Sequence, residues 1–300
     1  MPRWLLLTLL TMLLWGGWGV LSKPLSSALS PWQVQTFSSL GLLPVLALLG
    51  GSPNLRAGSE RKRGFALAFV SGVLGSLGNV AYYQALAAGG KAAAVTPITA
   101  LYPLVTIALA LLFLRERLNH MQALGIAASL AALYLFNVGG DTAWLSPWLA
   151  VALIPIGLWG TSALLQKLAT SAATSEWVTF AFLLGELPVA LATPLFQPLD
   201  PGLSGPTWLM VVLLGLFFAL GNYTLIFAYG SGGRAAVVTP LASLYAVVTI
   251  PLAVIFLHER VVFREWLGIA LALMAVVALS SEAKPGLSIA HDAGGTSAAT

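Results

Sequence analysis

The sequence has few charged residues and no cysteine. Charged side chains make up 8% of its 300 residues, whereas hydrophobic side chains make up 58%. A soluble domain carries roughly 25% charged residues, which keep its surface wet. This chain has too few polar groups to cover a water-exposed surface, so we expect lipid to surround most of it. The lack of cysteine excludes disulfides and thiolate metal sites within the chain.

The residue patterns of catalysis and ATP binding are also missing. The three histidines, His120, His258 and His291, lie at predicted connectors or near the C-terminus, and only one carboxylate lies well inside a predicted span. The phosphate-binding pattern Gly-x-x-x-x-Gly-Lys does not occur. Without a nucleophile paired with a base or a set of metal ligands, we do not expect an enzyme. We also expect no cofactor, no metal and no nucleic-acid partner.

Long apolar segments fill the chain from end to end. A transmembrane helix needs about 20 mostly apolar residues to cross about 30 Å of hydrocarbon. The expected spans are 4–22, 31–49, 64–88, 93–113, 120–138, 147–168, 176–196, 207–230, 236–257 and 263–281. The connectors between them are too short for a soluble domain. Residues 282–300 are polar and rich in Gly, Ser and Ala, which predicts a disordered cytoplasmic tail.

The first span has a second interpretation, because Arg3 followed by the apolar run 5–14 is also typical of a secretory signal. We interpret it as part of the fold, since residues 15–23 have a counterpart deep in the chain.

Basic residues predict the orientation in the membrane. With the N-terminus placed inside, ten basic residues fall on the inner side: Arg3, Arg56, Arg61, Lys62, Arg63, Arg115, Arg117, Lys167, Arg234 and Lys284. Four fall outside: Lys23, Lys91, Arg260 and Arg264. Cytoplasmic loops carry the excess of Lys and Arg. Both termini are therefore expected in the cytoplasm, with the chain as a multi-pass protein of the cell (inner) membrane.

The two halves of the chain repeat one another. With Thr239 aligned on Thr96, an offset of 143 (239 − 96), residues 72–137 match residues 215–280 without a gap at about 29 of 66 positions. Matches of Gly-Asn, Thr-Pro, Tyr and Glu-Arg exceed what apolar composition alone would produce. The first helices also match, with Trp15 on Trp159 at an offset of 144. The sequence therefore predicts a duplication.

An odd number of spans in each half turns the second half upside-down relative to the first. The predicted fold is thus an all-α integral membrane protein with ten transmembrane helices in two inverted five-helix repeats. Inverted repeats are the architecture of many secondary transporters, because two similar halves can exchange conformations around a central site.

The repeated residues also resemble a known family. A Trp-Gly pair near the start of each half, the pattern TPxxxLYxxVTIxLAxxFLxER and a following Leu-Gly-Ile-Ala helix resemble the EamA domain of the drug/metabolite transporter superfamily. The resemblance covers residues 4–138 and 147–281. It implies a ten-helix exporter or facilitator of amino acids, related metabolites or drugs, with both termini cytoplasmic.

Glu186 is the carboxylate that lies deep inside a predicted span, two residues before Pro188. Polar groups inside lipid are costly and need partners or a water-filled cavity. One interpretation is a group that couples proton movement to substrate movement. The other is a neutral carboxylic acid bonded to a backbone carbonyl that the proline frees.

Asn79 and Asn222 occupy equivalent positions in the third span of each repeat. Buried amides either hold helices together or face a central cavity. The neighbouring Tyr82, Tyr83 and Gln84 have no polar counterparts in the second repeat. Because packing should persist in both copies whereas recognition needs only one, we take these three as candidates for specificity, although successive helical residues cannot all face one way.

Further candidates recur in both repeats. Trp15, Trp159, Tyr102 and Tyr245 are expected to line a cavity. Thr96, Pro97, Thr239 and Pro240 are expected to begin the fourth span of each repeat, either as plain structure or as a hinge. Glu116, Arg117, Glu259 and Arg260 end those spans on opposite faces and are candidate clasps or gates. Lys23 and Lys167 either snorkel or bind a substrate anion.

These features together predict a secondary transporter, an exporter or facilitator, that moves small organic metabolites such as amino acids by alternating access between the inverted repeats. The alternatives are a channel-like facilitator and an exchanger of nucleotide sugars or phosphorylated metabolites. The expected partners are the lipid bilayer and a small-molecule substrate, and the oligomeric state is left open, a monomer included.

Overall fold

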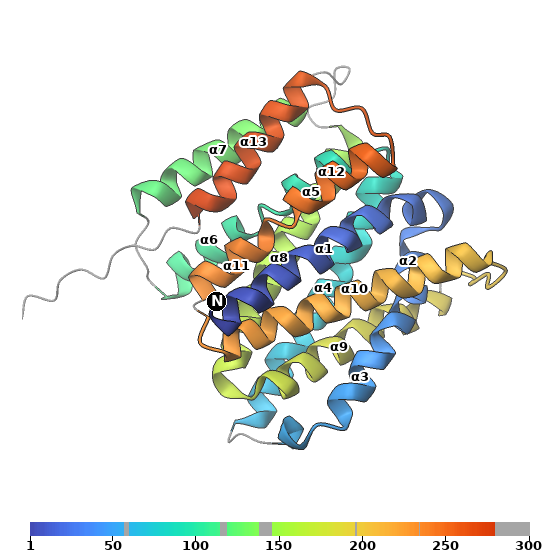
Figure 1. Ribbon diagram of the computed structural model, residues 1–300, viewed down its shortest axis with the longest axis vertical. Helices are drawn as coiled ribbons and strands as arrows, with labels where there is room; N and C mark the ends of the chain where they lie inside the picture. Colours follow the sequence, from blue (N-terminus) through green and yellow to red (C-terminus); the bar gives the residue numbers. More distant parts are fainter. Residues whose placement is uncertain (57–59, 115–118, 138–145, 196, 234, 280–300) are drawn as a thin grey trace, which may run out of the picture.

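The structure is a computed structural model that describes residues 1–56, 60–114, 119–137, 146–195, 197–233 and 235–279. Within these ranges every regular element is a helix (Figure 1). The predicted disordered tail, residues 282–300, lies outside the described residues. The prediction of an all-α protein is confirmed.

The helices follow one another in the same order in both halves. The first half contains α1 (Arg3–Ala28), α2 (Pro31–Ser38), η1 (Ser39–Leu42), α3 (Leu43–Gly50), η2 (Pro53–Arg56), α4 (Arg61–Ala87), α5 (Ala92–Thr99), α6 (Pro103–Leu114) and α7 (His120–Asn137). The second half contains α8 (Pro147–Ala172), α9 (Ser175–Ala192), η3 (Thr193–Leu195), α10 (Gly205–Gly230), α11 (Ala235–Ser243), α12 (Ala246–Phe256) and α13 (Phe263–Leu279).

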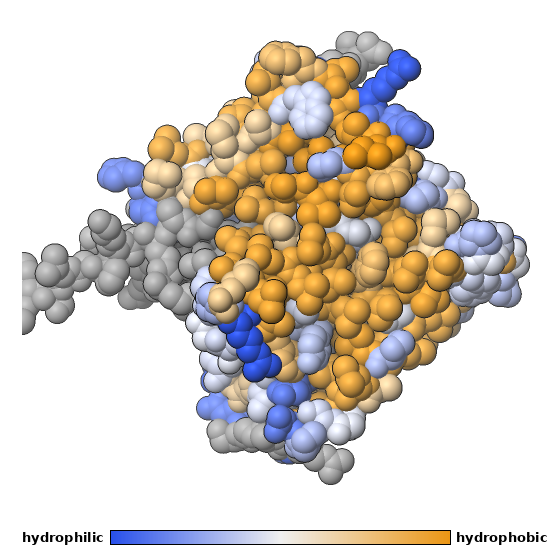
Figure 2. All heavy atoms as spheres, viewed as in Figure 1, coloured by the Kyte–Doolittle hydropathy of each residue, from blue (hydrophilic) through white to orange (hydrophobic). Residues whose placement is uncertain are grey.

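The outside of the protein is apolar, as a bilayer requires. Among the described residues, six helical segments are long and apolar enough to cross a membrane: α1, α2 with α3, α4, α8, α9 and α10. Figure 2 shows hydrophobic residues over most of the visible face, with hydrophilic residues near its edges. Exposed side chains such as Leu48, Leu124 and Tyr134 are therefore suited to contact with lipid.

The fourth span of each half is broken into two helices, which corrects the continuous helices expected at 93–113 and 236–257. In the first half, residues Ala100–Tyr102 separate α5 from α6. In the second half, Leu244 and Tyr245 separate α11 from α12. Irregular backbone at this depth is tolerated where it is buried in protein or lines a cavity, and Leu101, Tyr102 and Tyr245 are indeed buried.

Thr96 and Pro97 do not begin their helix, contrary to expectation. α5 begins at Ala92, and Pro97 lies inside the helix as its sixth residue. The earlier start has a physical cause: the carboxylate of Glu259 accepts hydrogen bonds from the backbone nitrogens of Ala92 (2.7 Å) and Ala93 (2.8 Å), which are the unpaired donors of a helix N-terminus. Likewise α11 begins at Ala235, so Thr239 and Pro240 also lie within their helix.

Helices of each half pack mainly on helices of the other half. The first helix of each half, α1 and α8, packs on the third helix of the other half, α10 and α4 respectively, and the two fifth helices, α7 and α13, pack on each other (Figure 1). Hydrogen bonds at equivalent positions also join the two halves. Thr106 Oγ1 donates to the carbonyl of Gly160 (2.8 Å), and Thr249 Oγ1 donates to the carbonyl of Gly16 (3.1 Å).

Glycine allows the closest helix crossings. A Cβ atom on Gly72 of α4 would collide with the backbone of α9 at Phe182, and a Cβ atom on Gly215 of α10 would collide with the backbone at Ser38. The two crossings are equivalent, since 215 − 72 = 143. Small residues let helix backbones approach where no hydrophobic effect drives the helices together.

The first helices of the two halves start on opposite sides of the protein. Near the end of α1, Lys23 Nζ donates to the carbonyl of Gly90 (2.8 Å), and Gly90 faces the ring of Trp148 near the start of α8. The start of α1 lies elsewhere, where Trp4 faces Gly233 after the end of α10. α1 and α8 therefore run in opposite directions, and the repeats are inverted as predicted.

Candidate functional site

A central cavity lies between the two halves. It has an empty volume of about 580 Å³, open space at its mouth included. Aromatic side chains form much of its wall: Trp15, Trp18, Tyr102, Trp159, Phe182, Phe218, Tyr229 and Tyr245. Apart from the hydroxyl and indole N–H groups of the aromatics, its polar side chains are Asn79, Ser162, Gln166 and Asn222. None of the described lining residues is basic or acidic.

The cavity is centred on the pseudo-two-fold relation between the repeats. Three pairs of equivalent residues line it: Trp15 with Trp159, Asn79 with Asn222, and Tyr102 with Tyr245. Equivalent glycines shape it, because a Cβ atom on Gly78 would collide with the Trp159 ring and one on Gly221 would collide with the Trp15 ring. The structure thus brings together six of the residues that the duplication singled out.

Tyr82 and Tyr83 lie behind the cavity wall and are covered by Trp18, a residue that the sequence repeat does not mark. Trp18 stacks on Tyr82 with ring centroids 4.7 Å apart, and its Nε1 donates to the hydroxyl of Tyr83 (3.2 Å). Trp18 lies one helical turn after Trp15 and lines the cavity itself. An i, i+3 spacing from Trp15 was the available signal.

Gln84 is separated from its two neighbours. Its side chain is exposed, whereas Tyr82 and Tyr83 are buried. Three successive residues of one helix point in different directions, and Gln84 takes the outward one. We therefore leave Gln84 out of the candidate site.

The threonines of the Thr-Pro motif are held by tyrosines from the third helix of the same half. The hydroxyls of Tyr82 and Thr96 are 2.9 Å apart, and those of Tyr229 and Thr239 are 2.8 Å apart. The two tyrosines are not equivalent in the alignment, because Tyr82 corresponds to Leu225 and Tyr229 to Leu86. The contact is thus kept in both halves although the tyrosine comes from a different turn of the helix.

Glu186 is completely buried on α9, 0% exposed, and its partners come from two other helices. Its Oε2 accepts hydrogen bonds from Gln35 Nε2 (3.2 Å) and from Asn79 Nδ2 (3.4 Å). These amides replace the freed backbone carbonyl that one interpretation of the sequence expected. Gln35 was not among the residues predicted for the site, although a glutamine inside the second expected span was a signal that could have indicated it. Asn79 also lines the central cavity, so it connects Glu186 to that cavity.

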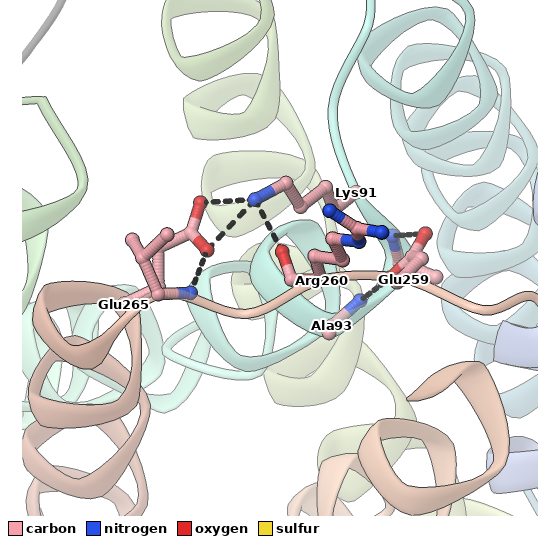
Figure 3. A network of polar contacts seen from close by, with 7 residues as sticks. Lys91, Ala93, Glu259, Arg260 and Glu265 are labelled. Carbon is pink, nitrogen blue, oxygen red and sulfur yellow. Dashed lines mark hydrogen bonds and ion pairs between the residues drawn. The ribbon is translucent and has the colours of Figure 1, made fainter. Parts of the chain in front are cut away.

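A polar cluster closes the structure at one side (Figure 3). Lys91 Nζ contacts both carboxylate oxygens of Glu265, at 2.7 and 2.8 Å, and donates to the carbonyl of Arg260. Glu259 caps the N-terminus of α5 beside it. Glu259, Arg260 and Glu265 belong to the second half, whereas Lys91 and α5 belong to the first. The cluster therefore ties the two halves together.

The equivalent residues on the opposite side are arranged differently or not described. Lys23 is half-buried and donates to the carbonyls of Leu86 (2.9 Å) and Gly90 (2.8 Å), whereas its counterpart Lys167 is exposed. Glu116 and Arg117, the counterparts of Glu259 and Arg260, lie outside the described residues. The cavity also extends along the later turns of α8 and α10, from Trp159 to Gln166 and from Asn222 to Tyr229, toward the side of Lys167.

Fold and cavity define a polytopic membrane protein with inverted repeats around a central site. The model of the EamA-like transporter family matches residues 2–138 and 146–281 of this chain. The chain belongs to the EamA-like transporter family.

Two relatives match parts of the chain. The chain is 36% identical over 137 residues to a Bacillus subtilis (strain 168) protein named uncharacterized transporter YojE, a match that covers 43% of this chain and 41% of that protein. It is 37% identical over 71 residues to the uncharacterized protein MJ1333.1 of Methanocaldococcus jannaschii, covering 24% of this chain and 51% of that one. These matches thus span about half or less of each relative's length.

Solved structures share the fold. One of them, titled only as the crystal structure of a protein, aligns with a TM-score of 0.62 at 21% sequence identity and covers 91% of this chain and 94% of its own. At this identity the likeness supports the fold alone.

Proposed function

We propose that this chain is a secondary transporter of small organic metabolites, such as amino acids, that works by alternating access. The observation that carries the proposal is the central cavity lined by equivalent residue pairs from both inverted repeats. A site on the pseudo-two-fold axis can be opened to either side by rocking one repeat against the other. A channel-like facilitator would need no such exchange of two conformations.

The described state is closed on the side of Lys91 and extends its cavity toward the side of Lys167. The positive-inside count places Lys23, Lys91 and Arg260 outside and Lys167 inside. On this orientation both termini are cytoplasmic, the protein lies in the cell (inner) membrane, and the structure corresponds to an inward-facing state. Glu259 and Arg260 then act in the outer gate.

The chemistry of the cavity favours one class of substrate. Aromatic rings and amides suit the apolar side chains and the amino or carboxyl groups of amino acids. Phosphorylated metabolites and nucleotide sugars call for basic partners, and the described lining residues include no Lys or Arg. The exchanger of phosphorylated compounds is therefore the weaker alternative.

Glu186 is the group that we expect to couple proton movement to transport. It is buried, and it accepts a hydrogen bond from Asn79, which also forms part of the cavity wall. Binding or loss of a proton changes whether the two amides face a carboxylate or a carboxylic acid. Asn79 would pass that change to the substrate.

Untargeted metabolite profiling tests the assignment and identifies the substrate. Cells that overexpress the protein should show one or a few compounds enriched or depleted in the medium, and Asn79→Ala and Trp159→Ala should abolish the change. Tyr134→Ala is the matched control, because Tyr134 is 67% exposed on the outer surface. The compound should then show saturable uptake in proteoliposomes that is stimulated by unlabelled compound on the other side. Linear, unstimulated flux would indicate a channel instead.

A further inference from the structure

A second, smaller cavity lies beside Glu186. It has an empty volume of about 190 Å³ and is lined by residues of α2, η1, α4, α9 and α10. Asn79 and Phe218 line both this cavity and the central one. The smaller cavity therefore adjoins the candidate substrate site through an amide and an aromatic ring.

Three oxygen acceptors of this cavity's lining residues have no hydrogen-bond donor among the described residues. They are Glu186 Oε1, Gln35 Oε1 and Asn79 Oδ1. Their side chains are 0%, 3% and 1% exposed. Because the two amides turn their NH₂ groups to Glu186 Oε2, their own oxygens are left without partners. Buried polar atoms are almost always paired, so these three oxygens call for a hydrogen-bond donor or a cation as their partner.

The charge of the lining residues indicates what that partner is. Glu186 is the only acidic residue among them, and none of them is basic. Among the described residues no group of three His, Cys, Asp or Glu side chains comes together, so the arrangement typical of a divalent or transition metal is not found. One carboxylate balances one positive charge.

The helix beside this cavity changes from α to 3-10 geometry. α2 ends at Ser38 and gives way to the 3-10 turn η1, and Ser38, Ser39 and Leu42 line the cavity. A stretch of 3-10 helix inside a longer helix often marks a functional position. Three of the lining residues, Ser38, Ser39 and Tyr83, carry hydroxyl groups.

We propose that the cavity formed by Glu186, Gln35 and Asn79 binds a monovalent cation of the size of Na⁺. The ion takes oxygen ligands from the carboxylate and the two amides, and its charge offsets that of Glu186 in a region without basic residues. It would share its carboxylate with the proton expected to bind there. Tyr83 is the only other titratable side chain among the described lining residues.

The test is ion-specific stabilisation of the full-length protein in detergent or nanodiscs. The melting temperature is measured in NaCl, KCl and choline chloride at constant ionic strength, and binding of radioactive sodium is measured in parallel. Na⁺ should raise the melting temperature saturably by about 2–4 °C, as expected for a ligand present at several times its dissociation constant. K⁺ and choline should have little or no effect.

Variants locate the site. Glu186→Gln and Gln35→Leu should both remove the Na⁺ response, and either one suffices if the other does not fold. Gln166→Leu is the matched control: it removes a buried amide of the central cavity that does not line the smaller one, so its Na⁺ response should remain. Equal melting temperatures in all three salts together with no sodium binding would overturn the proposal. A Na⁺ response that persists in Glu186→Gln would overturn it too. Neither result requires a substrate, so the transporter assignment would stand.

Discussion

At the scale of single residues, glycines at two equivalent positions set the distance between helices. Gly72 and Gly215 each meet the backbone of another helix, so a methyl group at either position has no space to occupy. Gly157 on α8 is also helical, but a Cβ atom there would find nothing within 4 Å. Substitutions at the three positions therefore separate the effect of close helix approach from the effect of intrinsic helix propensity.

We predict that Gly72→Ala and Gly215→Ala each lower the free energy of unfolding by about 1–3 kcal/mol, the usual cost of overpacking. Gly157→Ala should be neutral or should stabilise the helix by up to about 1 kcal/mol. Thermal unfolding of the purified variants checks this. Equal melting temperatures for all three would show that the crossings are not as close as the structure has them.

Glu186 gives a second prediction at this scale. Glu186→Gln keeps the shape of the side chain and one oxygen that can accept from Gln35 and Asn79, so the variant should fold. It cannot gain or lose a proton, so transport by the variant should no longer vary with pH, whereas wild-type transport should. The measurement is the initial rate of substrate transport by both proteins in proteoliposomes across a pH series. A variant that kept the wild-type pH profile would remove Glu186 from the coupling mechanism.

Much of the candidate site could be predicted from the sequence because duplication marks its residues twice. Trp15, Asn79 and Tyr102 stand out because their counterparts are identical in the second half, and all three line the cavity. Trp18 and Gln35 have no such counterpart. Their roles depend on contacts between helices far apart in the chain, which residue patterns within one helix do not reveal.

At the scale of helices, the broken fourth spans show how tertiary contacts override local pattern. The apolar residues of 93–113 are continuous enough to predict one helix, yet α5 ends at Thr99 and α6 begins at Pro103. Pro103 suits the first turn of α6, but its counterpart Ala246 begins α12 without a proline. The cap from Glu259, which comes from the other half of the chain, could not be read from the residues of α5.

The cap on α5 yields a prediction for the outer gate. Glu259→Ala leaves the N–H groups of Ala92 and Ala93 without their acceptor, and loss of a helix cap costs about 0.5–2 kcal/mol. The variant should melt at a lower temperature and should open more readily on that side. Glu60→Ala is the control, because the ion pair that Glu60 makes among the described residues is an exposed one with Arg63, and such pairs contribute little. If Glu259→Ala melted at the same temperature as Glu60→Ala, the cap would not contribute to the stability of the protein.

At the scale of the whole molecule, equivalent residues of the two repeats have different environments. Lys23 is bound to the end of α4 while Lys167 is exposed, and the cavity extends toward Lys167. An inverted duplication predicts a second state in which these roles are exchanged. The order and inversion of the helices followed from the sequence, because hydropathy, the odd span number and the repeat all constrain them. Which side is closed depends on a small energy difference between two similar states, and no residue pattern records it.

Crosslinking across the closed side tests alternating access most directly, and a chain without cysteine needs no prior removal of thiols. In Lys91→Cys/Glu265→Cys, a short reducible bis-methanethiosulfonate linker joins positions that are in contact between the two halves. The matched control is Glu60→Cys/Arg63→Cys, whose linker joins exposed neighbours at the start of α4. Alternating access predicts that the linker stops substrate transport in the first variant, that reduction restores it, and that the control transports throughout. Undiminished transport by the fully linked Lys91→Cys/Glu265→Cys protein would contradict alternating access between the inverted repeats.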